Sequence, residues 1–344
     1  MPNDGCLPEP VEPLKNFLQH TKDEYYCSPG VKIFCPSRLN LSWWQEVDCR
    51  PARPIRTVVL DETQKRRLLD DINEYLRPSS FQWYAKHGIP LRRGYLFHGP
   101  PGTGKTSLSF ALAGFFGLDI YVLSLTDPNL KEPDLLALFR RFPPRSVVLL
   151  EDIDSAGLGR AWKGEGQNEK GISLAGLLNA IDGVAAREGR VLIVTTNHPE
   201  RLDMALTRPG RLDIEVPFTN ITRTQAQDMF ERIFEANPEG EANPEGEANP
   251  EGEANPEGEA DPEDGADPDG EKPNHDTGVG ISHLAAKFSS TIPDKCLSPA
   301  ELQGYLLRCK GNPHKAVAGV KEWIEKHKEK KAKDGSGRTA MALD

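Results

Sequence analysis

The most restrictive feature of the sequence is the segment GYLFHGPPGTGKTS at residues 94–107. It reads as an apolar strand, a glycine-rich loop and the start of an apolar helix. Glycines allow a loop to wrap a polyphosphate with its amides pointing inward, and the helix N-terminus adds its dipole. Lys105 would then reach the β and γ phosphates, and the Thr106 hydroxyl would bind magnesium. Unless the segment is only a glycine-rich turn with an exposed lysine, the candidate binding residues are Gly99, Pro100, Pro101, Gly102, Thr103, Gly104, Lys105, Thr106 and Ser107.

Short apolar runs alternate with segments of helical length from Val58 to Phe218. This alternation is typical of buried parallel strands joined by crossover helices. We therefore predict an α/β fold with a parallel five-stranded sheet flanked by helices. The strands are expected at 95–97, 120–125, 147–150, 191–195 and 214–216.

Acidic residues follow the third of these runs, in RSVVLLEDID, where Glu151, Asp152 and Asp154 come directly after the apolar residues. Ligands of open α/β sheets bind at the carboxyl ends of the strands. One carboxylate can hold magnesium, and the next can orient and polarise an attacking water. Alone, three such acids would be solvated turn residues, but the phosphate loop upstream favours a site.

Polar residues also follow the fourth run, in VLIVTTNHPERLDMALTRPGRLD. The Asn197 amide could contact the γ phosphate or the water. Arg208 and Arg211 flank a Pro-Gly pair, and guanidinium groups stabilise charge on a transferring phosphoryl group. The alternative for the arginines is a surface salt bridge to Asp203 or Asp213.

The acidity of the chain is local. The formal net charge is −10, but residues 235–271 contain fifteen Asp or Glu and no Lys or Arg, so the rest of the chain carries −10 + 15 = +5. In this stretch the hexapeptide EANPEG runs four times. A six-residue period can indicate a β-solenoid, but with only Ala as an apolar residue and Pro in each repeat we predict a disordered loop. Net charge therefore does not exclude an anionic ligand.

Helices are expected on both sides of this tract. One covers 222–234, where Thr222 and Gln225 form a capping box. Order resumes near Ile281, and a second helix starts at Ser298, with Pro at its first position. A last helix at 316–328 leads into a lysine-rich tail. The second helix has Glu301 as its capping partner and a buried stripe of Leu302, Leu306 and Leu307.

Several classes of protein fit the sequence poorly. Its six cysteines are too sparse for a disulfide scaffold and show no zinc or redox spacing, which favours a reducing compartment. The longest uncharged apolar-leaning run, 106–118, is too short to span a membrane, and the N-terminus has no signal or transit pattern. The histidines are not spaced as metal ligands, and no His-Glu-x-x-His motif occurs. A Gly-rich loop at 156–171, with Arg160, Trp162 and Lys163, is read either as a substrate contact or as a surface loop.

Together, GPPGTGKT, the acids after the strand, LLNAIDGV at 177–184 and TTNHPERLDMALTRPGRLD resemble an AAA ATPase over residues 57–327. Within that class, WWQEVDCRPARPIRTVVLDETQK and VVLLEDIDSAG resemble the mitochondrial Bcs-type chaperones, especially fungal ones. The resemblance implies an AAA P-loop NTPase fold with a C-terminal helical lid domain and a partial β-rich N-terminal segment specific to the Bcs type. It also implies ATP and Mg²⁺ as ligands.

The resemblance further assigns roles. Bcs-type members have Glu before Asp where most AAA proteins have the reverse order. The resemblance therefore implies that Glu151 is on the metal-binding side and that Asp152 activates the water. Asn197 is the γ-phosphate sensor. Arg208 and Arg211 act on the nucleotide of a neighbouring subunit, which implies a ring of identical chains. The implied client is a protein, namely the iron-sulfur subunit of respiratory complex III, at the mitochondrial inner membrane, with no nucleic acid partner.

The sequence departs from that family in three ways. Members usually begin with a membrane helix and a fuller specific domain, of which about residues 12–56 are recognisable here. The acidic hexapeptide array is not part of the family pattern. No aromatic-hydrophobic-Gly pore motif follows the second strand, where TDPNLKEPDLLALF argues against threading of an unfolded chain.

We expect four parts and weigh three functions. The leading hypothesis is an ATP-hydrolysing chaperone. The second is a nucleotide-binding scaffold without hydrolysis, and the third, a small-molecule kinase, leaves the arginines and the lid without a role.

The expected parts of the chain are a partial Bcs-type N-terminal segment at 1–56, an α/β ATPase domain at 57–220, a helical lid domain at 221–328 interrupted by an acidic repeat at 235–274, and a basic, flexible tail at 329–344.

Overall fold

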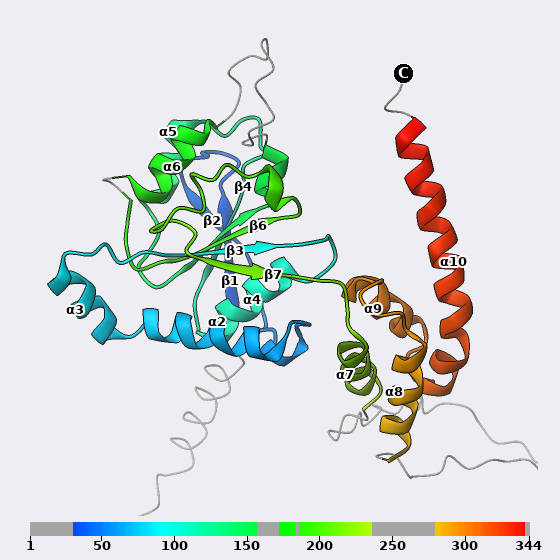
Figure 1. Ribbon diagram of the computed structural model, residues 1–344. Helices are drawn as coiled ribbons and strands as arrows, with labels where there is room; N and C mark the ends of the chain where they lie inside the picture. The colour runs from blue at the N-terminus through cyan, green and yellow to red at the C-terminus, as the bar shows by residue number, and fades with distance from the viewer. Residues whose placement is uncertain (1–29, 157–171, 184–185, 236–278, 341–344) are drawn as a thin grey trace, which may run out of the picture. The chain divides into compact units, whose positions relative to one another are not determined.

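The computed structural model describes residues 30–156, 172–183, 186–235 and 279–340, the last nine only by their backbone. These residues form two compact units (Figure 1): one comprises the described residues up to 225 together with 293–303, and the other comprises the described residues of 226–292 and 304–340. The predictions for the acidic repeat beyond residue 235 and for the loop 157–171, with Arg160, Trp162 and Lys163, lie outside the described residues.

The first unit is built on one sheet, whose strand order is β2-β1-β4-β5-β6-β3-β7. Strands β3 to β7 run parallel to one another, as predicted, and β3 lies between β6 and β7. The strands are β1 (Val31–Pro36), β2 (Trp44–Arg50), β3 (Arg93–His98), β4 (Ile120–Ser124), β5 (Val147–Glu151), β6 (Val191–Thr196) and β7 (Ile214–Pro217).

The predicted strand count of five was wrong, because the sheet has seven strands. The N-terminal β-rich segment joins the sheet as its edge: β1 pairs parallel with β4, and β2 pairs antiparallel with β1. Pairing satisfies backbone groups on the free side of β4, and aromatic contacts reinforce it. Phe34 stacks on Tyr121 with ring centroids 4.6 Å apart, and Trp44 donates its indole N–H to the Leu138 carbonyl at 3.1 Å.

Helices cover both faces of the sheet, and apolar side chains alternate between them (Figure 1). Tyr95 and Phe97 pack with helices α2 and α4, whereas Leu96 packs with α5 and α6 on the opposite face. The strands are therefore buried on both sides, as expected for parallel strands with crossover helices. The helices of this unit are α2 (Glu62–Tyr75), α3 (Pro78–His87), α4 (Lys105–Phe115), α5 (Glu132–Phe139) and α6 (Leu174–Asp182).

Among the described residues, four more helices follow the sheet: α7 (Arg223–Phe234), α8 (Val279–Thr291), α9 (Pro299–Arg308) and α10 (Pro313–Ala340). Both predicted capping boxes are confirmed. Gln225 N–H donates to the Thr222 hydroxyl at 3.3 Å and the Gln225 side chain accepts from Thr222 N–H at 3.0 Å. At α9 the corresponding distances between Ser298 and Glu301 are 3.3 and 2.8 Å.

Two details of these helices differ from expectation. Leu302 and Leu306 are buried, but Leu307 is 53% exposed, because the buried stripe continues through Tyr305 and Cys309 at helical spacing. The last helix was predicted over 316–328 with a flexible tail after it, whereas α10 runs to Ala340. Lys, Glu and Ala, which dominate residues 325–333, are strong helix formers and extend it.

An ionic contact ties α2 to the start of β3. The Arg93 guanidinium pairs with the Asp71 carboxylate, which also accepts the Tyr95 hydroxyl at 2.5 Å. The hydrogen bond with Asp71 is the largest influence on the pKa of Arg93 and raises it, whereas burial is the main reason why the pKa of Tyr95 is raised. This carboxylate therefore accepts from two donors at once, the fully buried Tyr95 hydroxyl and the partly buried Arg93 guanidinium.

Asp71→Asn should lower the free energy of unfolding by about 2–3 kcal/mol, because removing one partner of a partly buried ion pair leaves the other charge uncompensated. Urea unfolding followed by circular dichroism measures this loss. Asp70→Asn, an exposed neighbour on the same helix, is the matched control and should change stability by less than about 0.5 kcal/mol. Equal losses in the two variants would contradict a specific role for Asp71.

Candidate active site

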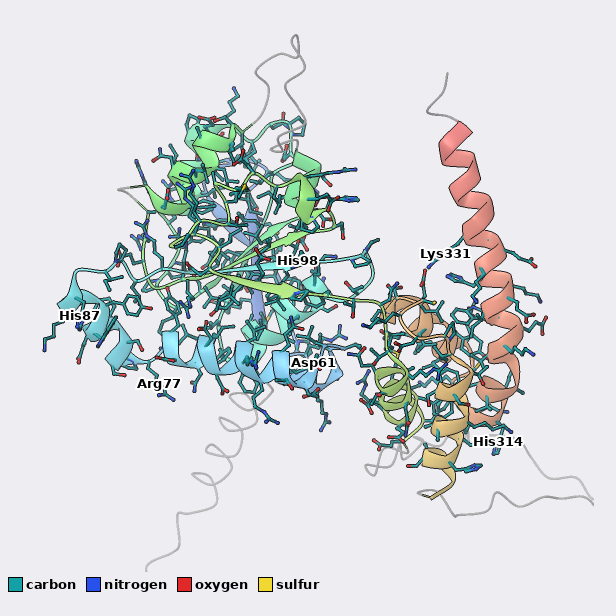
Figure 2. The ribbon with its side chains drawn as sticks, in the orientation of Figure 1. Asp61, Arg77, His87, His98, His314 and Lys331 are labelled. Atoms are coloured by element: carbon teal, nitrogen blue, oxygen red, sulfur yellow. The ribbon has the colours of Figure 1, made fainter. Side chains whose placement is uncertain are left out.

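The loop between β3 and α4 has a backbone that only glycine adopts readily at three positions. Gly99, Gly102 and Gly104 have φ angles of 139°, 76° and 101°. At Gly99 there is also no space, since a Cβ atom would lie 2.1 Å from the Phe218 carbonyl oxygen. The loop starts directly after His98, the last residue of β3, which is labelled in Figure 2. It turns tightly from the strand into the N-terminus of α4, as the sequence predicted for a phosphate-binding loop.

Lys105 opens α4 and is only 7% exposed. Its ammonium donates to the carbonyls of Gly99 and Pro100 at 2.8 and 2.9 Å and to Asn197 Oδ1 at 2.7 Å. Burial lowers the pKa of Lys105, and the carboxylates of Asp152 and Asp154 oppose that shift. The lysine charge is therefore held inside the loop by oxygen acceptors, where phosphate oxygens would bind it.

Thr106 and Glu151 lie side by side, with the Thr106 hydroxyl donating to Glu151 Oε1 at 2.9 Å. Hydroxyl and carboxylate oxygens are hard ligands of the kind that Mg²⁺ prefers. Within the described parts of the chain, no group of three or more His, Cys, Asp or Glu side chains could hold a metal by itself. The pair fits Mg²⁺, which uses one or two protein oxygens together with phosphate and water ligands.

Asp152 and Asn197 meet beside the lysine. Asn197 donates its amide N–H to Asp152 Oδ1 at 3.3 Å while its amide oxygen accepts from Lys105. Asp152 is exposed and has a φ of 45°, which is uncommon for a residue with a side chain. The structure thus brings together Lys105, Thr106, Glu151, Asp152 and Asn197 at the carboxyl ends of β5 and β6.

Three supporting residues were not assigned roles from the sequence. The buried Thr195 hydroxyl accepts Asp152 N–H at 3.0 Å. Asp154 Oδ1 accepts the Thr196 hydroxyl at 2.8 Å and Asn197 N–H at 3.2 Å. These bonds fix the end of β6 to the residues after β5. The signal available in the sequence was the pair of threonines directly before Asn197.

The Arg211 guanidinium binds two partners in its own chain. Its guanidinium donates to Asp182 Oδ2 and to the Ala205 carbonyl, both at 2.6 Å. Neither alternative partner pairs with it: Arg211 pairs with Asp182, whereas Asp203 accepts from the Ala205 amide and Asp213 from the Gly210 amide. The suggested salt bridge to Asp203 or Asp213 was therefore wrong in its partner.

Arg208 differs from Arg211 in its surroundings. It is exposed, and its backbone carbonyl accepts Arg211 N–H at 3.2 Å, which closes the turn through Gly210. No hydrogen bond or ion pair of the described residues joins either guanidinium to the phosphate loop of the same chain.

The start of α9 meets the phosphate loop within the first compact unit. Ala300 N–H donates to the Gly102 carbonyl at 3.1 Å, and the Ser298 hydroxyl oxygen lies 3.1 Å from where a Gly102 Cβ would be. Nothing in the sequence indicated this contact. It makes Gly102 a close-approach position as well as a turn position.

None of the helices that the structure describes combines the length and apolar character of a membrane span.

Two family comparisons cover most of the described chain. Residues 95–220 match the "ATPase family associated with various cellular activities (AAA)", and residues 223–322 match the "Mitochondrial chaperone BCS1-like, ATPase lid domain".

Individual relatives agree with these matches. The "Probable mitochondrial chaperone bcs1" of Schizosaccharomyces pombe is 47% identical over 190 residues, which cover 55% of this chain and 42% of that protein. The "Mitochondrial chaperone BCS1" of Bos taurus is 44% identical over 189 residues, covering 54% and 45%. The "Probable mitochondrial chaperone BCS1-A" of Dictyostelium discoideum is 33% identical over 291 residues, covering 82% and 58%.

The chain thus spans about half the length of the curated relatives it matches. The order of the strands, the loop around Lys105 and the matched residues agree with one another. Together they show that the chain carries an AAA domain followed by a lid domain of the mitochondrial chaperone BCS1-like type.

Proposed function

We propose that this protein binds ATP with Mg²⁺, hydrolyses it within a ring of identical chains, and uses the cycle to remodel or translocate a protein client. The observation that carries the proposal is the continuous contact from Lys105 through Asn197 to Asp152, beside the pair of Thr106 and Glu151. This contact supports the proposal because a cation suited to phosphate, a hydroxyl–carboxylate pair suited to Mg²⁺ and a carboxylate suited to orienting water would then act at one edge of the sheet.

Each residue has a distinct part in this mechanism. The loop amides and Lys105 hold the β and γ phosphates in place. Thr106 and Glu151 would hold Mg²⁺, which would neutralise charge on the phosphate oxygens. Asp152 orients the attacking water, and the amide of Asn197 positions the water or the γ phosphate. Catalysis here is mostly positioning and electrostatic stabilisation, so the rigid ends of β5 and β6 matter as much as the acids.

Arg208 and Arg211 have different roles in this proposal. Arg211 is held by Asp182 and Ala205, so it shapes the turn in its own chain. Arg208 is exposed on that turn and is free to reach the nucleotide of a neighbouring chain. Ring assembly of this kind is usual for AAA proteins, and an arginine supplied by a neighbour makes hydrolysis depend on assembly.

The client and the location rest on the relatives. Their names describe mitochondrial chaperones. We infer from the family resemblance that the protein acts in mitochondria, at the inner membrane, on a folded client such as the iron-sulfur subunit of respiratory complex III. The second candidate, a scaffold that binds ATP without hydrolysis, is separated from the first by turnover measurements on the variants below.

Lys105→Ala and Asp152→Asn should separate binding from hydrolysis. Lys105→Ala removes the cation from the loop and should abolish ATP binding in calorimetry. Asp152→Asn keeps the loop intact, so binding should persist while turnover falls by about 10²–10⁴-fold, the range of a lost general base. Asp70→Asn serves as the control on both assays. Turnover that survives Asp152→Asn would rule out the role given to Asp152, and wild-type binding with no turnover would favour the scaffold.

Specific ATP turnover should rise with protein concentration if a neighbour completes the site. Arg208→Ala should then reduce turnover by about 10³–10⁵-fold, the usual contribution of such an arginine, without lowering stability. Mixing Arg208→Ala with Lys105→Ala should restore activity, because one variant keeps the site and the other keeps the arginine. Turnover that is independent of concentration, with no rescue in the mixture, would mean that each chain acts alone.

Thr196→Val should weaken positioning without removing any group that contacts ATP. The variant loses the hydroxyl that Asp154 accepts, so Asn197 loses part of its anchoring. We expect kcat to fall about tenfold, equivalent to one net hydrogen bond, with little change in ATP affinity. Thr207→Val is the control, since its hydroxyl donates only to the nearby Met204 carbonyl on the surface. A loss of affinity without a loss of kcat would contradict the positioning role.

A further inference from the structure

A small cavity lies behind the turn that carries the two site arginines. Its volume is about 10 Å³, which is enough for one particle of the size of a water molecule. Four of its seven lining residues are arginines. The lining consists of Arg92, Arg93, Ile181, Arg190, Leu192, Gly210 and Arg211.

The positive charges around this cavity are only half compensated. Arg93 pairs with Asp71 and Arg211 pairs with Asp182. Arg92 donates to the carbonyls of Asp182 and Gly183 at 2.7 and 3.5 Å. Among the described residues, no carboxylate oxygen comes within 4.0 Å of the nitrogens of its guanidinium.

Arg190, like Arg92, forms no ion pair with a carboxylate of the described residues, and it is more deeply buried. It is only 5% exposed, and its guanidinium donates to the carbonyls of Arg187 and Ile181, the latter at 2.9 Å. It lies over the rings of Phe139 and Phe142, which hold it but offer no lone pair. Burial lowers the pKa of Arg190 to about 10, so the group is charged at neutral pH.

Each of these two arginines has one donor without a partner. The Nε–H groups of Arg92 and Arg190 are buried, and neither has a hydrogen-bond acceptor within the described residues. Leaving a buried donor of a charged group without an acceptor is costly, and such exceptions in folded proteins indicate a bound water or ion. Both side chains line the same cavity, so one acceptor placed there could serve both donors.

We propose that this cavity is a binding site for one monatomic anion, chloride under physiological conditions, held by the Nε–H groups of Arg92 and Arg190. Glu188 is the one carboxylate whose charge raises the pKa of Arg190, but among the described residues it forms no ion pair with Arg190 or Arg92. A water molecule would satisfy the two donors without adding charge, whereas an anion supplies both an acceptor and a negative charge. The small volume favours a monatomic ion over phosphate, sulfate or a carboxylate. This site requires no nucleotide and does not rest on ATP hydrolysis.

An anion in this cavity would affect the turn at residues 208–211, which carries Arg208 and Arg211 and is called the arginine turn below. Gly210 and Arg211 form part of the cavity wall, and Arg211 is bound to Asp182, whose carbonyl accepts from Arg92. An anion in the cavity neutralises the repulsion between the guanidiniums that meet there. It should therefore hold the turn in place and stabilise the folded chain.

Thermal unfolding of the full chain should depend on chloride itself and not on ionic strength. When sodium chloride replaces sodium gluconate at constant ionic strength, the wild-type Tm should rise by about 2–4 °C once chloride exceeds its Kd about tenfold. Arg92→Gln should show no such rise. Arg141→Gln is the matched control, because Arg141 also donates to two backbone carbonyls, of Ser42 and Ala137, but lies outside the cavity, so its Tm should rise as in the wild type.

Diffraction from wild-type crystals grown in sodium bromide tests the site without any variant. An anomalous peak between Arg92 Nε and Arg190 Nε is expected. A water molecule at that place without anomalous signal, or a chloride response that is the same in Arg92→Gln and in the wild type, would overturn the proposal. Neither experiment involves ATP, so failure of this site and failure of the proposed hydrolysis are distinguishable.

Discussion

A buried ammonium group requires acceptors, and the site of this protein is arranged around that requirement at Lys105. The acceptors come from the loop before α4 and from Asn197 at the end of β6. Desolvation lowers the pKa of the lysine, while the nearby acids favour its charged form. Because one cation takes its partners from two segments, the loop and the strand ends cannot be positioned independently of each other.

The parts of this arrangement that follow from local chemistry could be predicted from the sequence. The run Val147–Leu150 is apolar throughout because β5 is covered on both faces, and such a run signals a parallel strand. Once the strands are known to be parallel, their carboxyl ends share one edge, so Glu151, Asp152 and Asn197 must come together. The capping boxes of α7 and α9 were predictable for the same reason, since each involves residues three positions apart.

The parts that depend on distant pairing could not be predicted. Whether the N-terminal strands extended the sheet or stood apart was decided by Phe34 and Trp44 against Tyr121, about eighty residues away in the chain. The partner of Arg211 was misjudged because two acids lay nearer in sequence than Asp182. Exposure of Leu307 was misjudged because the buried face of α9 follows the spacing of Leu302, Tyr305, Leu306 and Cys309, and Leu307 lies outside that face. In each case the local sequence pattern indicated the chemical type of the residues, but not which distant residues they contact.

The same strand that ends at the phosphate loop begins at the arginine turn. Gly94 packs so closely on this turn that a Cβ atom would lie 1.7 Å from the Arg211 carbonyl oxygen, and its own carbonyl accepts Asp213 N–H at 2.9 Å. Five residues later β3 has given way to Gly99, a distance of about 16 Å along an extended strand. A strand paired on both sides is stiff. In the proposed ring, displacement of the turn by a neighbouring chain would therefore be transmitted along β3 to the Gly99 carbonyl that accepts from Lys105.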